Sequence, residues 1–204
     1  MKTELCDIMT KYGSDKGNGY HIYTILYYDM FNNIKNDGLN IFELGLGTNN
    51  IDVPSNMGSS GIPGASLRGW REFFVNSNIY GADIDSRILF NEDRIMTFYC
   101  DQLNSDDINK MWDNEVLNNL LFDVIIDDGL HTFESNLNFL ENSLHKLNND
   151  GVYICEDLSL NTVELFKKEF DTLKIKYPKL TFEIVNLDTP NNQYDNNLLI
   201  VKQK

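Results

Sequence analysis

Residues 39–47 read Leu-Asn-Ile-Phe-Glu-Leu-Gly-Leu-Gly, an apolar run that ends in a Gly-x-Gly turn. Such a run is typical of a buried parallel strand that leads into a loop facing a nucleotide or a phosphate. The turn lacks the third glycine of NAD-binding sequences, because Asn50 stands at that position. By itself, the turn predicts a nucleoside site and leaves the nucleoside open.

Further short apolar runs follow the first, and each ends in or just before an acidic residue: 78–82, 95–100, 122–126 and 151–155. The segments between most of these runs carry apolar residues at helical spacing, such as Leu67, Trp70 and Phe73. Strands that alternate with helices predict a parallel, doubly wound α/β sheet of the Rossmann-like kind.

The last part of the chain predicts a different ending. We expect a helix over 160–177, a break at Pro178, and strands over 180–187 and 197–201. The loop 188–196 between these strands is typical of an antiparallel hairpin. We therefore predict a seven-stranded, mostly parallel sheet with a C-terminal antiparallel hairpin, whereas dinucleotide-binding folds usually continue in parallel.

The size of the chain predicts one domain over residues 1–204, because 204 residues that are 42% hydrophobic suffice for one sizeable core. Residues 1–37 are expected to form a helical prelude, rich in tyrosine, before the first strand. Residues 48–65 form a long loop of glycine, serine, asparagine and proline near the expected active site. A loop of this length inside a compact domain is usually functional or mobile.

The formal net charge of -14 argues against a nucleic acid as partner, because such binding depends on lysine and arginine at the phosphates. The same charge argues against anionic membranes, and no apolar run approaches the roughly 20 residues of a membrane span. The first residues lack the apolar stretch of a secretion signal, so we expect a cytoplasmic protein.

Cys6, Cys100 and Cys155 show no CxxC spacing, which predicts reduced thiols rather than a disulfide framework or a zinc site.

The residues that end the first strands bear on the nucleoside site, since ligands of open α/β sheets lie beyond the carboxyl ends of the strands. Gly45 and Gly47 let the backbone approach a nucleoside, and Asp83 can accept hydrogen bonds from two ribose hydroxyls. Asp101 and Gln102 end the third strand, where they can meet an adenine edge. Each carboxylate alone could equally be a solvated strand end. Together they favour a bound nucleoside.

The fourth and fifth strands end in Asp127-Asp128-Gly129-Leu130-His131 and Cys155-Glu156-Asp157. Neighbouring strands lie about 4.8 Å apart, which brings Asp128, Glu156 and Asp157 within reach of one point. Carboxylates this close repel one another unless a cation or a proton neutralises them. Such hard oxygen ligands indicate Mg²⁺, or else Mn²⁺ or Ca²⁺, rather than zinc. His131 is then the expected general base, because imidazole titrates near neutral pH. The structural alternatives are a solvated acidic rim and an exposed or loop-capping histidine.

These motifs resemble the metal-dependent O-methyltransferases of macrolide sugars of the mycinamicin type, which are class I S-adenosylmethionine-dependent methyltransferases. The matching segments occur in the same order: 11–16, 42–47, 64–70, 80–84, 127–131 and 156–158. The resemblance implies that Asp128, Glu156 and Asp157 bind the metal, and that His131 and Asp128 form the catalytic centre. The residues expected on the cofactor side are Lys11, Ser14, Glu43, Gly45, Gly47, Ser66, Asp83, Asp101, Gln102 and Asp127.

The acceptor pocket of that family does not carry over. The chain is shorter, we expect it to lack the large N-terminal domain of the mycinamicin type, and its loop 48–63 is its own. Tyr20, His21 and Tyr23 of the prelude could cover an acceptor, although aromatic residues at such spacing are more often packing residues.

The leading hypothesis is Mg²⁺-assisted transfer of a methyl group from S-adenosylmethionine to a hydroxyl of a sugar or sugar-derived small molecule, such as a surface-polysaccharide precursor. One alternative is a nucleotide-dependent oxidoreductase or epimerase on a similar sheet. Another is a non-catalytic, methyltransferase-like binding module. The acceptor, its charge and the assembly of the chain into a homo-oligomer stay open.

Overall fold

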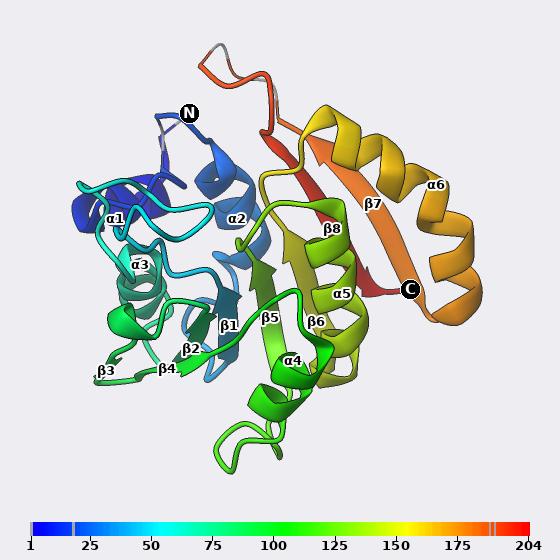
Figure 1. The fold of residues 1–204 in the computed structure, drawn as a ribbon. Coiled ribbons are helices and arrows are strands. Elements are labelled where there is room, and N and C mark those ends of the chain that lie inside the picture. The colour runs from blue at the N-terminus through cyan, green and yellow to red at the C-terminus, as the bar shows by residue number, and fades with distance from the viewer. Residues whose placement is uncertain (1, 18, 188, 190) are drawn as a thin grey trace.

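The computed structural model describes residues 2–17, 19–187, 189 and 191–204, and a mixed sheet runs through its centre (Figure 1). Among these residues the sheet has eight strands in the order β3-β4-β2-β1-β5-β6-β8-β7. The strands are β1 Asn40–Leu44, β2 Asn78–Asp83, β3 Asn91–Glu92, β4 Ile95–Tyr99, β5 Phe122–Asp127, β6 Leu147–Cys155, β7 Leu180–Asn186 and β8 Asn197–Gln203.

Strands β4, β2, β1, β5 and β6 pair in parallel and form the core of the sheet. The last residue of β1, Leu44, lies opposite Ala82 of β2 and Asp127 of β5. The chain builds the sheet outward from β1 on one side through β2 and β4, and on the other side through β5 and β6. The strand order therefore reverses beside β1, which is where sheets of this class bind ligands. The predicted doubly wound α/β sheet is confirmed.

The C-terminal strands confirm the predicted antiparallel hairpin. β8 pairs antiparallel with β6 on one side and with β7 on the other. Of the expected loop 188–196, residues 188 and 190 lie outside the described residues, as does Met1 of the expected domain. The additional strand is β3, whose two exposed residues pair antiparallel with β4. Two residues are too few to show an apolar pattern, so the sequence predicted only seven strands.

Helices cover both faces of the sheet in two layers (Figure 1). α1, α2 and α3 bury one face, through residues such as Met9, Tyr27 and Trp70. α4, α5 and α6 bury the other face, and the two successive β1 residues Ile41 and Phe42 belong to different clusters, as the alternation of side chains along a strand requires. The helices are α1 Glu4–Tyr12, α2 Tyr23–Phe31, α3 Ala65–Phe73, α4 Ser105–Trp112, α5 Phe133–Ser143 and α6 Leu160–Lys176, with short 3₁₀ turns η1 Ser86–Ile88 and η2 Leu144–Lys146.

Among the described residues of the prelude, helix is confined to α1 and α2. Gly13 ends α1 in a left-handed conformation with φ +85°, and its N–H bonds to the carbonyls of Met9 and Thr10. Residues 13–17 and 19–22, which follow α1, are not helical, and Lys16 and His21 among them are buried. The prelude therefore covers one face of the sheet and also delivers polar side chains to its edge. No described helix is both long and apolar enough to cross a bilayer.

The aromatic cluster under β1 gives a test of the core. Phe42 is fully buried, and its ring centroid lies 4.6 Å from Trp112 and 5.7 Å from Phe122. We expect Phe42→Ala to lower the free energy of unfolding by about 3–5 kcal/mol, because the cavity among these rings cannot fully collapse. Urea denaturation measures this loss. Ile175→Ala, at a position 82% exposed on α6, serves as the control and should change stability by less than about 0.5 kcal/mol.

Candidate active site

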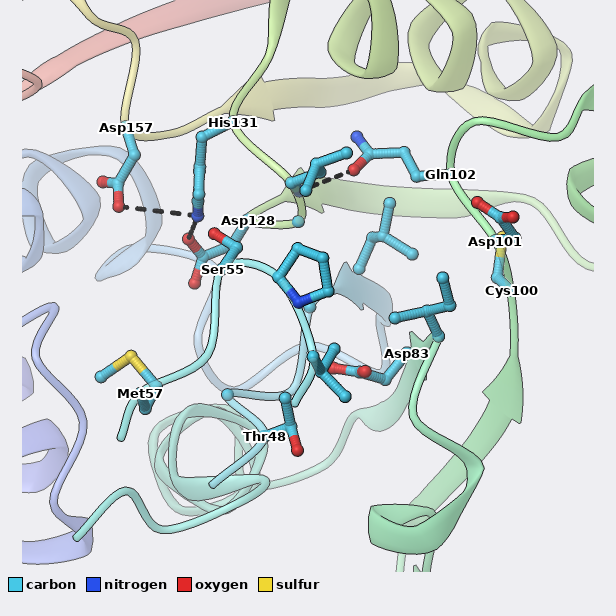
Figure 2. A pocket seen from close by; sticks show the side chains of 18 of the residues that line it. Thr48, Ser55, Met57, Asp83, Cys100, Asp101, Gln102, Asp128, His131 and Asp157 are labelled. Atoms are coloured by element: carbon cyan, nitrogen blue, oxygen red, sulfur yellow. Dashed lines mark hydrogen bonds and ion pairs between the residues drawn. The ribbon is translucent and has the colours of Figure 1, made fainter. Parts of the chain in front are cut away.

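A pocket of about 190 Å³ opens at the carboxyl ends of the parallel strands, where the strand order reverses (Figure 2). The glycine turn after β1 and the ends of β2, β4, β5 and β6 all contribute to its lining, and residues of the loop 48–64 close one side. Side chains from five strand ends therefore converge on one space, as the strand-end argument predicted.

The glycine turn lies against the loop that follows β5. Gly45 has φ +90°, and a Cβ atom there would lie 1.9 Å from the carbonyl oxygen of Asp128. Its N–H donates to the carbonyl of Ala82 at 2.8 Å, which ties the turn to β2 as well. Only glycine allows both this conformation and this close approach.

Asp83 shapes the pocket floor from the end of β2. One carboxylate oxygen accepts from the N–H of Leu46 at 2.7 Å and the other from the N–H of Asp85 at 2.8 Å. Burial raises the pKa of Asp83, and these two hydrogen bonds oppose that rise. A carboxylate has about four lone-pair sites, so Asp83 can still accept bonds from a ligand in the pocket.

Gln102 and Asp127 hold the loops on the opposite side. The Gln102 amide donates to Asp127 at 2.7 Å, and its oxygen accepts from the N–H of Leu130 at 2.8 Å. Asp127 is fully buried and also accepts from Asn136 at 3.1 Å. Burial raises the pKa of Asp127 to about 6. Asp127 therefore braces the site from beneath, while Gln102 reaches the pocket itself.

The predicted cofactor-side residues separate into three groups. Gly45, Gly47, Asp83, Asp101 and Gln102 line the main pocket. Ser14 and Ser66 line a smaller adjoining pocket, which also touches both glycines.

Lys11, Glu43 and Asp127 line neither pocket. Lys11 is exposed and pairs with Glu72 on the outside of α3. Glu43 is fully buried beneath the turn and accepts hydrogen bonds from the Ser66 hydroxyl and the Trp70 indole N–H.

The acidic strand ends bring Asp128, His131 and Asp157 together at the pocket edge (Figure 2). One ligand atom from each lies within 4.8 Å of the others. Nε2 of His131 lies 4.0 Å from a carboxylate oxygen of Asp128 and 4.0 Å from one of Asp157. This set of two carboxylates and an imidazole, open to the pocket, fits a hard divalent cation or a proton-transfer site.

The backbone holds His131 in an uncommon conformation. His131 and Asp157 have φ +62° and φ +55°, in the left-handed region that residues other than glycine seldom adopt. α5 begins directly afterwards, with Thr132 and Ser135 forming a capping box. Nδ1 of His131 is buried without a hydrogen-bond partner among the described residues. Nε2 is the nitrogen that faces the two carboxylates.

Glu156 is not part of this open cluster. Its side chain is 1% exposed and accepts hydrogen bonds from the ammonium of Lys16 and the hydroxyl of Tyr27. The structure thus brings two of the three predicted metal ligands to the pocket and turns the third toward the prelude. Burial raises the pKa of Tyr27 well above its usual value, so its hydroxyl stays protonated and donates.

The chain is similar in sequence to known O-methyltransferases. No protein-family model matches the chain. The 8-demethyl-8-alpha-L-rhamnosyl tetracenomycin-C 2'-O-methyltransferase of Streptomyces olivaceus is 28% identical over 82% of this chain and 41% of its own length. The mycinamicin VI 2''-O-methyltransferase of Micromonospora griseorubida is 27% identical over 77% of this chain and 36% of its own length. The chain therefore matches less than half the length of these curated relatives.

Among solved structures, the MycE methyltransferase of the mycinamycin biosynthetic pathway, in complex with Mg and SAH, superposes with a TM-score of 0.72. The match covers 100% of this chain and 55% of MycE at 23% identity. The chain therefore has the same fold as this methyltransferase. The resemblance to sugar O-methyltransferases that the motifs indicated is confirmed by these relatives.

The sequence did not single out Lys16 or Tyr27, and it named Tyr23 only as a residue that could cover an acceptor. Lys16 and Tyr27 hold Glu156, and Tyr23 donates to Asp157 at 2.7 Å. The spacing of Tyr23 and Tyr27 places both on one face of a helix, which could have indicated a common target. Lys16 lies in the Lys11 to Lys16 motif, but nothing in the sequence distinguished it from Lys11.

The close approach at Gly45 gives a test of the site's architecture. We expect Gly45→Ala to lower the free energy of unfolding by about 1–3 kcal/mol more than Gly58→Ala, because only at position 45 would the added methyl group clash with backbone. Both glycines have positive φ, +90° and +68°, but a Cβ at Gly58 would meet nothing within 4 Å. Urea denaturation of the two variants separates strain in φ, which both share, from the clash. Equal losses would show that Gly45 is required only for its φ.

Proposed function

We propose that this chain is an S-adenosylmethionine-dependent O-methyltransferase that acts on a hydroxyl of a sugar or a sugar-bearing small molecule, with the help of a divalent cation. The observation that carries the proposal is the juxtaposition of two half-sites in one pocket. The glycine turn and Asp83 line one side, and Asp128, His131 and Asp157 stand at its edge. A nucleoside-binding module alone has no use for the second half.

The cofactor side suits a nucleoside with a free ribose. Gly45 and Gly47 leave room for close approach, and the carboxylate of Asp83 can accept hydrogen bonds from ribose hydroxyls. Asp101 lies beside Gln102 at the β4 end, where a carboxylate can accept from an adenine amino group. S-adenosylmethionine supplies the activated methyl group, and these residues fix its position relative to the acceptor.

The acidic edge suits a metal-assisted acceptor site. Asp128 and Asp157 present carboxylate oxygens to the pocket, and Glu156 is the third proposed ligand, although Lys16 and Tyr27 hold it in this structure. A divalent cation held by these carboxylates would supply Lewis-acid chemistry, which lowers the pKa of the acceptor hydroxyl. His131 then takes the proton of the acceptor hydroxyl at Nε2, and the two neighbouring carboxylates stabilise the imidazolium that forms.

The relatives support a sugar hydroxyl as the acceptor. The name of the Streptomyces olivaceus protein specifies 2'-O-methylation of a rhamnosyl compound, and that of the Micromonospora griseorubida protein specifies 2''-O-methylation of mycinamicin VI. We propose a glycoside or sugar-derived precursor for this chain, including a surface-polysaccharide precursor. No feature of the described residues favours an oxidoreductase, since Asn50 replaces the third glycine and the pocket edge is acidic.

Removal of metal tests whether methyl transfer requires a divalent cation. We expect excess EDTA to abolish methyl transfer from S-adenosylmethionine to methyl glycosides such as methyl α-L-rhamnoside, and added Mg²⁺ to restore it. Binding of S-adenosylhomocysteine, measured by calorimetry, should survive EDTA because the cofactor-side residues need no metal. NAD, as the control ligand, should give no binding heat. Full turnover in EDTA would exclude the cation from the reaction, and tight NAD binding would favour the oxidoreductase instead.

Substitution of the proposed base tests its role. We expect His131→Ala to lower kcat about 100-fold or more without changing affinity for S-adenosylhomocysteine, since the imidazole acts on the acceptor. His145→Ala is the matched control, because His145 is exposed beyond α5 and lies outside the pocket lining. Rate measurements across pH complete the test. An unchanged kcat in His131→Ala would assign proton removal to another group.

A further inference from the structure

Lys16 is a buried cation inside the acidic end of the sheet. Its side chain is 2% exposed, and its ammonium forms ion pairs with Asp128 and Glu156 and lies 3.8 Å from an oxygen of Glu43. Among the described residues, no other lysine or arginine forms an ion pair with these three carboxylates. A lysine is seldom buried this completely unless its charge is compensated.

The ammonium divides the carboxylate oxygens between the interior and the pocket. Glu156 has both oxygens engaged, one by Lys16 and one by Tyr27. Asp128 gives Oδ2 to Lys16, while its Oδ1 faces Nε2 of His131 at 4.0 Å. For a cation that enters from the pocket, Asp128 therefore has one carboxylate oxygen already bonded to a partner, and Glu156 has both.

Asp157 differs from these two carboxylates. Its partners are the hydroxyl of Tyr23 at 2.7 Å and the imidazole of His21 at 3.5 Å, both on the prelude side. Its other oxygen faces His131 at 4.0 Å. None of these contacts carries the fixed positive charge of a lysine. The competition between an internal and an external cation thus centres on Asp128 and Glu156.

We infer that Lys16 is a positioning residue, a resident counter-cation that competes with the divalent ion for Asp128 and Glu156. This inference rests on the proposed metal site. Without metal, the ammonium neutralises part of the acidic cluster and keeps Glu156 folded inward. Coordination by Glu156 requires the ammonium to withdraw, which the flexible four-carbon stem of lysine allows. Lys16 thereby sets how tightly the site holds its metal and keeps the metal-free protein folded.

Removal of the charge should change metal affinity and metal-free stability in opposite directions. We expect Lys16→Met to bind Mg²⁺ at least about 10-fold more tightly in calorimetric titration, because an opposing charge a few ångströms from the carboxylates is gone. In EDTA its Tm should fall by about 10 °C, because buried carboxylates lose their counter-cation. Saturating Mg²⁺ should recover most of that loss, since the metal replaces the missing charge.

Lys167→Met is the matched control. It removes the same formal charge from an exposed residue on α6 that pairs with Glu164. We expect its Mg²⁺ affinity and its Tm to stay at the values of the unaltered protein. A gain in affinity confined to Lys16→Met then reflects local competition rather than the overall charge of the chain.

A second pair of variants keeps the test valid if Lys16→Met alone does not fold. Glu156→Gln and the double variant Lys16→Met with Glu156→Gln leave fewer uncompensated charges inside. In the Glu156→Gln background, removal of Lys16 should again tighten Mg²⁺ binding, because Lys16 then competes with the metal only at Asp128.

The outcomes separate the inference from the function beneath it. Mg²⁺ binding by the unaltered protein with no gain in either Lys16 variant would overturn the competition and leave the proposed function standing. A fall in Tm that Mg²⁺ relieves no more than in the unaltered protein would also overturn it, because Lys16 would then be a structural ion pair only. No Mg²⁺ binding by any of these proteins would remove the metal from the proposed function and, with it, the basis of the inference.

Discussion

The acidic end of the sheet is fixed by backbone hydrogen bonds that continue the parallel ladder past the strand ends. The N–H of Asp128 donates to the carbonyl of Leu44 at 2.9 Å, and the N–H of Glu156 donates to the carbonyl of Asp127 at 2.9 Å. Neighbouring strands lie about 4.8 Å apart, so the carboxylates that follow β5 and β6 are held close whatever their charge. They cannot relieve their repulsion by separating. It must be relieved by partners that come to them.

The prelude supplies most of these partners. Lys16 and Tyr27 engage Glu156, and Tyr23 and His21 engage Asp157. The same segment packs its apolar side chains on one face of the sheet. The packing of that face and the electrostatics of the site therefore depend on one stretch of chain. A change in the prelude that loosens the packing also moves the groups that neutralise the cluster.

The sequence predicted the elements of the site better than their orientations. The order of strands and helices placed Asp83, Asp101, Asp128 and Asp157 at one edge of the sheet, and the structure brings them to one pocket. The orientation of two adjacent acidic residues was harder to predict, because adjacent residues of a strand point to opposite faces. Of the Asp127 and Asp128 pair, only Asp128 reaches the pocket.

Side-chain orientation also explains why Glu156, Lys11 and Glu43 lie outside the pocket where the sequence predicted them. Glu156 turns inward because Lys16 meets it, and that contact joins residues 140 positions apart in the chain. A local pattern contains no information on such a contact. Lys11 and Lys16 are the same residue type in the same motif. Gly13 ends α1 between them, and only Lys16, which follows it, is buried. Glu43, two residues before the first glycine, is buried beneath the turn by Ser66 and Trp70 of α3.

Asn50, at the position where an NAD-binding turn has its third glycine, explains how the loop 48–64 is held at the pocket. Its amide donates to Asp85 at 2.7 Å, and the hydroxyl of Thr48 donates to the same carboxylate oxygen at 2.6 Å. Hydrogen bonds from Arg87 keep the pKa of Asp85 below its usual range, so this acceptor stays charged. A glycine at position 50 would remove one of these anchors. The departure from the dinucleotide pattern thus helps Thr48 to fasten the loop to the turn after β2, and the loop in turn forms a wall of the pocket.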